Sequence, residues 1–137
     1  MSVGYSGTPL AKKLGIKAGH RVGTLNAPPH FPDLLESRPD DVAIETEPPA
    51  DVELDVAVVF VTDEGELTAR FSEISRRLRS NGGLWVSWPK KISPLATDLR
   101  DSHVRTVGLE AELVDNKVCA IDKDWSGLRF VYRVSDR

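Results

Sequence analysis

Apolar residues in this chain fall into short runs separated by turns rich in glycine, proline and polar side chains, a pattern that predicts β-strands. The run LDVAVVFVT is apolar along almost its whole length, which is typical of a strand covered on both faces. Trp85 and Trp88 should lie in the core on opposite faces of the fourth strand. The predicted strands are residues 21–26, 42–46, 54–62 and 84–88, followed by two strands within 111–134 that are joined by a turn at 122–127.

A helical period separates the third and fourth of these strands. The apolar positions that repeat with this spacing are Leu67, Phe71, Ile74 and Leu78. They predict a helix within residues 63–80, with SNGG at 80–83 as its C-cap and turn. Shorter helices are predicted for LAKKLG, capped by Thr8 with Pro9 as its first residue, for HFPDLLESR, and for residues 97–107, where Gly108 should end the helix.

Strands that alternate with helices predict an α/β fold. We expect a single Rossmann-like domain over residues 1–137, with three layers and a mainly parallel sheet of about six strands. The predicted strand order is 2-1-3-4-6-5, with an antiparallel C-terminal hairpin whose last strand is inserted between strands four and five.

Composition narrows the class of protein. The chain has 137 residues and a formal net charge of -3, so no overall positive field would attract nucleic acid or a membrane surface. The single cysteine, Cys119, excludes an internal disulfide and fits a reducing compartment. The first residues lack the apolar core of a signal peptide, and no apolar run reaches membrane-spanning length. These features predict a cytoplasmic protein.

Candidate chemistry gathers where the predicted strands end, because ligands of open parallel sheets bind at the carboxyl ends of the strands. Lys90 and Lys91 follow the fourth strand and could meet an anion, although solvated lysines are the commoner outcome. Ser6 and Thr8 flank a glycine before a helix, which could present amides to an anion near Lys90 and Trp125; alternatively, Thr8 only caps the helix. The candidate ligand-binding residues are Ser6, Thr8, Asn26, Trp88, Lys90, Lys91, Asp122, Trp125 and Ser126.

Catalytic and metal-binding patterns are not evident. The three histidines lack metal-ligand spacing, and no serine, threonine or cysteine is placed by the pattern beside a histidine base. We therefore predict no metal, no cofactor and no catalytic residue. The predicted function is non-catalytic binding of a small anionic ligand or a protein partner.

Two segments resemble class I methyltransferases. LAKKLGIKAGHRVGTLNAP is similar to the entry of that fold, and GLEAELVDNKVCAIDKDWSGLRFVYRV is similar to its closing helix end and hairpin. The resemblance implies S-adenosylmethionine as cofactor, with Glu45 or Glu47 placed for its ribose hydroxyls. The glycine-rich loop of that family is replaced here by Asn26-Ala27-Pro28-Pro29, whose prolines lack amide donors. A diverged methyltransferase is the alternative function.

Several strings along the whole chain also resemble a family of small bacterial proteins to which no activity is assigned. These strings are YSGTPLAKKLGIK, LNAP, GGLWVSWPKK, ATDL, LVDNKVCAID and WSGLRFV. This resemblance implies the same Rossmann-like layout and no particular reaction.

Overall fold

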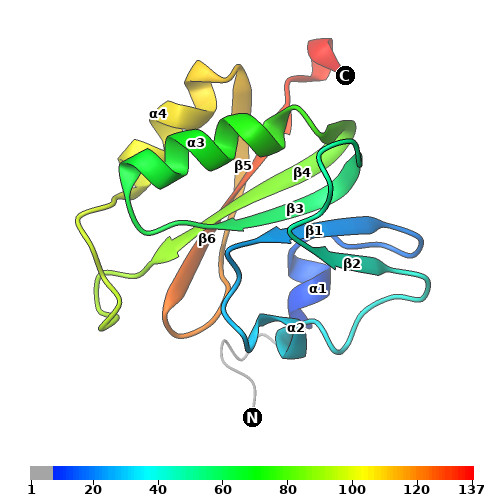
Figure 1. Cartoon of the computed structure of the whole chain (residues 1–137), viewed down its shortest axis with the longest axis horizontal. Coiled ribbons are helices and arrows are strands. Elements are labelled where there is room, and N and C mark those ends of the chain that lie inside the picture. Colours follow the sequence, from blue (N-terminus) through cyan, green and yellow to red (C-terminus); the bar gives the residue numbers. More distant parts are fainter. Residues whose placement is uncertain (1–7) are drawn as a thin grey trace.

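A six-stranded sheet forms the middle of the molecule in the computed structural model, which describes residues 8–137 (Figure 1). The order is β2-β1-β3-β4-β6-β5; the first four strands are parallel to one another, and β6 is antiparallel to both of its neighbours. The predicted order and the antiparallel hairpin are confirmed. The strands are β1 (Arg21–Leu25), β2 (Ala43–Thr46), β3 (Leu54–Phe60), β4 (Leu78–Pro89), β5 (Leu113–Ala120) and β6 (Trp125–Tyr132).

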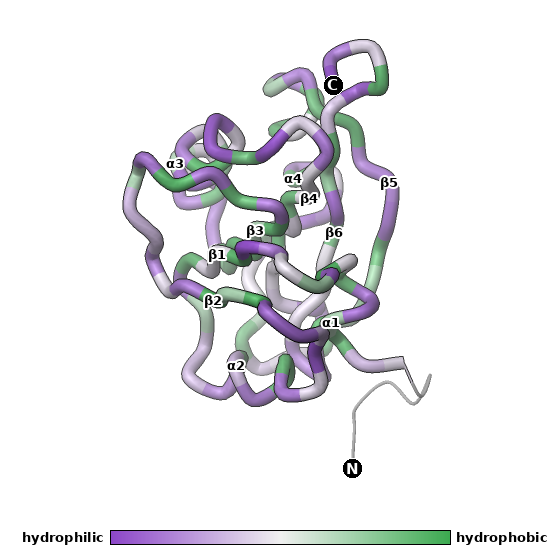
Figure 2. The backbone as a smooth tube through the Cα atoms, turned by 90° about the vertical axis from the view of Figure 1, so that its right-hand side faces the viewer, coloured by the Kyte–Doolittle hydropathy of each residue, from purple (hydrophilic) through white to green (hydrophobic). Residues whose placement is uncertain are grey.

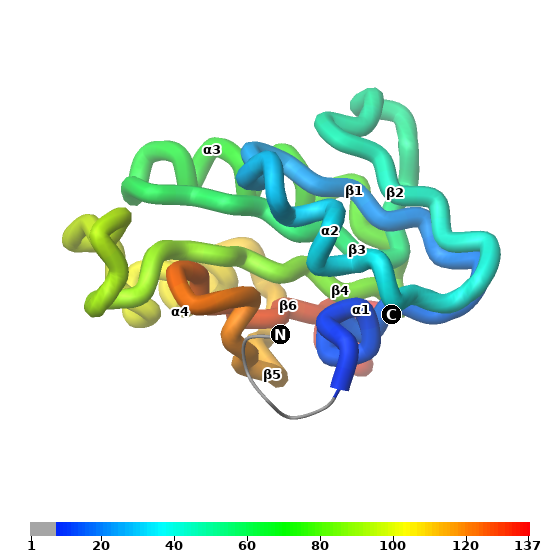
Figure 3. The backbone as a smooth tube through the Cα atoms, turned by 90° about the horizontal axis from the view of Figure 1, so that it is seen from below, coloured from blue at the N-terminus to red at the C-terminus, as the bar shows by residue number. Residues whose placement is uncertain are grey.

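Helices cover both faces of this sheet. The helices α3 (Glu64–Ser75) and α4 (Asp101–Glu110) lie on one face, and α1 (Leu10–Lys13) and α2 (Phe31–Leu34) lie on the other (Figures 1 and 3). A short 3-10 helix, Val134–Asp136, ends the chain. Pro9 occupies the N-cap position of α1, so the helix begins one residue later than predicted.

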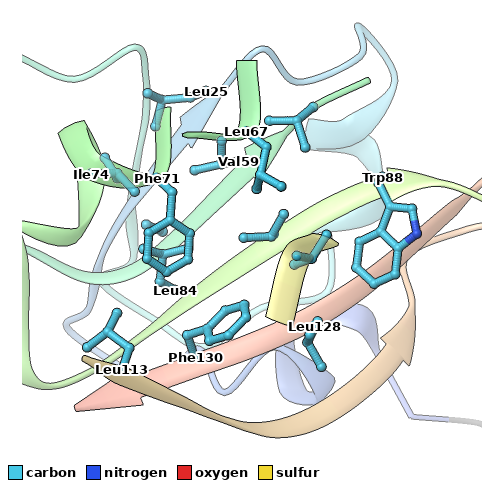
Figure 4. Close-up of a cluster of buried hydrophobic side chains, with 14 of the residues drawn as sticks. Leu25, Val59, Leu67, Phe71, Ile74, Leu84, Trp88, Leu113, Leu128 and Phe130 are labelled. Carbon is cyan, nitrogen blue, oxygen red and sulfur yellow. The ribbon is translucent and has the colours of Figure 1, made fainter. Parts of the chain in front are cut away.

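Two apolar clusters fill the spaces between these layers. Beneath α3 and α4, Phe71 meets Phe130 of β6 edge-on, with ring centroids 5.2 Å apart (Figure 4). On the other face, the fully buried Trp85 donates its indole N–H to the carbonyl of Leu14 at 2.9 Å, which fixes α1 to the sheet. Trp88 belongs to the first cluster and Trp85 to the second, so their predicted burial on opposite faces is confirmed.

The central strands are the most apolar part of the backbone in Figure 2, and polar positions gather in the outer loops. This agrees with the buried run of β3, in which every residue from Val56 to Phe60 is buried. Among residues 8–137, no helix is long and apolar enough to cross a lipid bilayer.

The end of α3 differs from the prediction. The helix stops at Ser75, and Leu78 begins β4 opposite Leu54. Arg77 explains the early stop: its guanidinium is buried and donates to the carbonyls of Pro48 and Pro49, while its own carbonyl accepts the amide of Leu54. These bonds draw the chain out of the helix and into the sheet.

The SNGG segment lies inside β4 and does not form the predicted turn. The pairing of β3 with β4 shifts between Leu54 and Val56, which accommodates the extra residues of β4. A Cβ on Gly82 would lie 2.7 Å from the carbonyl oxygen of Asp55, and one on Gly83 would lie 2.4 Å from Nε of Arg129. Gly82 is therefore required by a backbone contact within the sheet, whereas a side chain at Gly83 would displace the guanidinium of Arg129.

The helix predicted for residues 97–107 is also displaced. Thr97 lies in the preceding loop, where its hydroxyl donates to the carbonyl of Thr62 at 2.7 Å. The helix begins at Asp101 and continues through Gly108 to Glu110, so Gly108 does not end it. A Cβ on Gly108 would lie 2.0 Å from Cε1 of Phe130, which explains a glycine inside the helix.

A β-bulge at Asn116 interrupts β5. Asp115 pairs with Phe130 and Lys117 pairs with Arg129, so Asn116 has no partner of its own. The side chains of Asp115 and Lys117 consequently point to opposite faces of the sheet. Asp115 faces α4, where it accepts a hydrogen bond from Arg105, and Lys117 faces the side covered by α1.

Candidate functional site

The carboxyl ends of β1, β3 and β4 meet at one edge of the sheet, as expected for parallel strands (Figure 1). Because β5 is parallel to β4, the turn between β5 and β6 lies at this same edge. Asn26, Lys90 and Asp122 therefore share a rim, as the sequence predicted.

A cavity of about 280 Å³, here called the β4-end pocket, opens at this rim. It lies between the end of β4, the loop that follows, the start of α4 and the terminal hairpin. Four of the predicted site residues line it: Trp88, Lys90, Lys91 and Ser126. The remaining lining residues are Pro89, Thr97, Leu99, Arg100, Asp101, Arg105, Val118 and Leu128.

The loop that carries the two lysines is fixed at several points. The amide of Lys90 donates to the carbonyl of Asp124 at 2.8 Å. The buried hydroxyl of Ser93 donates to the carboxylate of Asp124 at 2.9 Å, and Thr97 ties the end of the loop to the end of β3. The hairpin turn and β3 therefore hold the loop in place beside the pocket.

Positive charge predominates in the β4-end pocket. Within residues 8–137, Lys90, Lys91 and Arg100 form no ion pair, and the guanidinium of Arg100 contacts only the carbonyl of Thr97, at 3.3 Å. Arg105 is neutralised, because it pairs with Asp101 at 3.6 Å and also with Asp115. The pocket thus presents three cationic groups without a carboxylate partner in the described chain.

Trp88 forms part of the apolar wall. It is 8% exposed and packs in the first cluster with Leu128. Its indole nitrogen points away from that cluster (Figure 4) and has no hydrogen-bond partner among residues 8–137. Trp88 therefore offers both an apolar surface and an N–H donor.

Asp122 and Trp125 lie at the rim but outside the pocket. The buried carboxylate of Asp122 accepts the amides of Asp124 and Trp125 and contacts Nε2 of His30 at 2.7 Å. Burial opposes ionisation, but these hydrogen bonds and the charge of His30 outweigh it and lower the pKa of Asp122. Trp125 packs edge-on against Phe60 on the opposite face, with ring centroids 5.0 Å apart.

Asn26 lies at the end of β1 in a network of its own. Its φ of 57° is in the left-handed region. Its backbone N–H donates to the Glu47 carboxylate at 2.7 Å. Its side chain contacts Arg70 at 3.2 Å and Glu66 at 3.4 Å, and Arg70 also lies 3.6 Å from Glu47. Of the two acids predicted near the end of β2, Glu47 reaches Asn26 at the carboxyl end of β1, whereas Glu45 pairs with Arg21 at the start of β1.

No family model matches this chain, and no curated protein matches it in sequence. An S-adenosylmethionine-dependent methyltransferase from Aquifex aeolicus matches with a TM-score of 0.66 at 12% identity, over 88% of this chain and 86% of that chain. A TehB-like S-adenosylmethionine-dependent methyltransferase from Corynebacterium glutamicum matches with a TM-score of 0.60 at 9% identity, over 95% and 90%.

The magnesium protoporphyrin IX methyltransferase of Synechocystis PCC 6803, solved with bound SAH, matches with a TM-score of 0.57 at 10% identity, over 85% of this chain and 75% of that one. The chain has a methyltransferase-like fold. This finding confirms the resemblance in layout that the sequence suggested, and at such identities it concerns the fold alone.

Of the N-terminal candidates, Thr8 is among the described residues, and it does not line the β4-end pocket. Ser6, and the expectation that the first residues fold over the rim, lie outside the described residues. Thr8 directly precedes Pro9, and Pro9 lines a different cavity together with Lys12 and Lys17.

Arg100 and Arg105 are the cationic pocket residues that sequence reasoning missed. Both come from the start of α4, and they reach the end of β4 only because the intervening loop folds back. In the sequence they appear only as two arginines within a predicted helix. Arginines in such positions more often lie on a solvated surface.

Groups that could bind a metal or act as nucleophiles are sparse in the described chain. Among residues 8–137, no three histidine, cysteine, aspartate or glutamate side chains gather as a metal site. Burial raises the pKa of Cys119 to about 11, with a smaller opposing effect from Lys13, so the thiol is protonated at neutral pH.

Proposed function

We propose that this protein is a binding domain for a small anionic ligand, which occupies the β4-end pocket. One observation carries the proposal: Lys90, Lys91 and Arg100 converge on a cavity without a carboxylate partner within residues 8–137. Cations that no carboxylate neutralises are suited to binding phosphate or carboxylate groups.

The donors of the pocket complement one another. The guanidinium of Arg100 can form two parallel hydrogen bonds to one phosphate or carboxylate, and the lysines add point charges. Trp88 and Ser126 supply neutral donors beside an apolar wall that includes Leu128. A volume of about 280 Å³ suits a small metabolite with one anionic group and a short apolar portion.

The pocket lining supports binding more than catalysis. Its described residues include no histidine or cysteine, and its single carboxylate, Asp101, is paired with Arg105. Within residues 8–137, no base forms a hydrogen bond with the hydroxyl of Thr97 or Ser126, and the Thr97 hydroxyl is engaged with the carbonyl of Thr62.

The test is calorimetric titration with phosphorylated metabolites, nucleotides and acyl-CoAs at low ionic strength. Replacing Lys90 and Lys91 together by alanine should weaken binding by about tenfold or more, because each charged hydrogen bond contributes about 1.5–3 kcal/mol. Lys123→Ala is the matched control, since this exposed lysine belongs to the same rim but does not line the pocket. Amide shifts that still map to residues 88–91, together with a Kd that the double substitution leaves unchanged, would contradict the proposal.

Binding of S-adenosylmethionine at the end of β1 is the second candidate. It is favoured by the position of Glu47 beside Asn26, in a fold whose neighbours include S-adenosylmethionine-dependent methyltransferases. The fit to the cofactor is poor for two reasons. The Glu47 carboxylate already contacts the backbone N–H of Asn26 and the guanidinium of Arg70. The loop after β1 contains Pro28 and Pro29, which lack the amide donors that a cofactor would need. We therefore derive no methyl-transfer step.

Calorimetry with S-adenosylmethionine and S-adenosylhomocysteine separates the two candidates. Binding that is lost in Glu47→Gln but retained in Glu45→Gln and in the Lys90 and Lys91 double variant would favour the cofactor site. Glu45 is the matched control because its carboxylate pairs with Arg21 at 3.0 Å, away from Asn26. The absence of binding at millimolar concentration would exclude the second candidate.

A further inference from the structure

A second cavity lies on the other face of the sheet, between α1, the segments that precede β1 and β2, and the middle of β5. Its volume is about 670 Å³, and we call it the α1 groove. It shares no residue with the β4-end pocket. The lining residues are Pro9, Lys12, Gly15, Ile16, Lys17, Ala18, Ser37, Arg38, Pro39 and Lys117.

The charge of the α1 groove is of one sign. Four of its lining residues are cationic, and among the described residues that line it there is no acid. Within residues 8–137, none of these four forms an ion pair, and their charged groups form one hydrogen bond, of 3.0 Å, from Arg38 to the carbonyl of Leu35. This concentration of positive charge contrasts with the net charge of -3 for the whole chain.

Arg129 adds a fifth cation directly behind the groove. It lies opposite Lys117 in the ladder between β5 and β6, on the same face, because the bulge at Asn116 turns Lys117 toward α1. Its Nη2 lies 3.9 Å from the Cβ position of Gly15, a lining residue. Nε of Arg129 is buried and has no partner within the described chain.

These cations are held together at an energetic cost. Like charges directly opposite each other in a ladder are destabilising. Burial, followed by the charge of Arg137, lowers the pKa of Arg129, because both oppose its positive charge. An anion in the α1 groove would relieve both effects.

We propose that the α1 groove binds a small polyanion, a phosphorylated ligand that carries at least two negative charges. Four cations around one cavity exceed what a single carboxylate needs, and about 670 Å³ accommodates a ligand of nucleotide size. Pro9, Ala18 and Pro39 provide apolar contacts for the uncharged portion of such a ligand. This site is independent of the β4-end pocket.

The test is calorimetric titration of the full chain with sodium tripolyphosphate and with ATP at low ionic strength. We expect replacement of Lys12 and Lys117 by alanine to raise the Kd by about tenfold or more. Lys13→Ala is the control on the same helix, because Lys13 does not line the groove, and its Kd should stay within about twofold of the wild-type value. Amide spectra with tripolyphosphate should show shifts for residues 15–18.

Three results would overturn the proposal. One is no binding of either probe at millimolar concentration. Another is binding that is unchanged in both the alanine variant and Lys117→Glu, with circular dichroism showing that the variants are folded. The third is tighter binding of an oligoglutamate peptide than of tripolyphosphate, which would identify the groove as a protein-binding surface.

Discussion

At the scale of single residues, Asp122 connects two parts of the rim. One carboxylate oxygen accepts the amides of Asp124 and Trp125 at 2.8 and 2.9 Å, which shapes the turn between β5 and β6. The other contacts His30, the residue before α2. A buried acceptor with three donors is a point where one substitution leaves several polar groups unsatisfied.

We expect Asp122→Ala to lower the free energy of unfolding by about 2 kcal/mol at pH 7, because two amides and His30 lose their acceptor. His30→Ala should cost about 1 kcal/mol, since it removes only one of these bonds. Urea denaturation measures both changes. Lys123→Ala, an exposed change in the same turn, should stay within about 0.5 kcal/mol of the wild type.

The effect of Asp122 should depend on pH in one direction. Its pKa in the folded protein is lower than the value of about 3.9 for an unfolded aspartate. The stabilisation is therefore complete above about pH 4 and is lost as the pH falls through the native pKa. The difference in unfolding free energy between wild type and Asp122→Ala should shrink from pH 7 to pH 3, and a constant difference would contradict this assignment.

Sequence reasoning grouped Asp122 and Trp125 with the ligand contacts because both are distinctive residues at a rim. Their partners, His30 and Phe60, lie far away along the chain, and no periodicity reports such contacts. Their position at the rim could be predicted from the sequence. Their contacts with His30 and Phe60 could be seen only in the folded structure.

At the scale of elements, the packing of α4 on β6 depends on one glycine. We expect Gly108→Ala to destabilise the protein by about 2 kcal/mol or more, because its Cβ would lie 2.0 Å from Phe130 and force the helix away from the sheet. The matched control is Gly65→Ala in α3, where the nearest atom is 3.4 Å from the new Cβ. It should stabilise by about 0.5 kcal/mol through helix propensity. Thermal unfolding followed by circular dichroism compares the two variants, and equal effects would contradict this explanation.

The pairing of β5 with β6 leads to a second prediction, which concerns the stability of the sheet. Lys117→Glu should raise the free energy of unfolding of the ligand-free protein by about 0.5 kcal/mol, because it replaces repulsion from Arg129 with attraction. Denaturation in urea at low salt measures the gain, and added salt should reduce it. A loss of stability would show that the two side chains do not interact across the ladder.

The sequence patterns predicted the presence of helices and strands more reliably than the residues at which they end. The continuous apolar run of β3 was predicted correctly, and so were three of the four positions of the α3 stripe, Leu67, Phe71 and Ile74. The early end of α3 depends on carbonyls that Arg77 finds in another loop, and the glycines of SNGG meet close neighbours across the sheet. Such endings are set by tertiary contacts, which local propensity does not encode.

At the scale of the whole molecule, the order of the sheet was predictable because right-handed crossovers leave few alternatives. The lining of the β4-end pocket, the candidate site, was only partly predictable. The rule that ligands bind at the strand ends located Lys90 and Lys91, but Arg100 enters the same pocket through a loop whose path the sequence does not specify. The α1 groove lies away from the rim, where this rule does not apply.

The bulge at Asn116 also affects how copies of the molecule meet. β5 is an edge strand, and a regular exposed edge offers unpaired backbone groups to a neighbouring copy, which favours aggregation. The bulge and the charge of Lys117 make this edge a poor template, while β2, the other edge, has only four residues. Deleting Asn116 would restore a regular ladder and leave Lys117 facing α1. We expect sedimentation velocity to show concentration-dependent self-association of the deletion variant, whereas the wild-type chain would sediment unchanged over the same range.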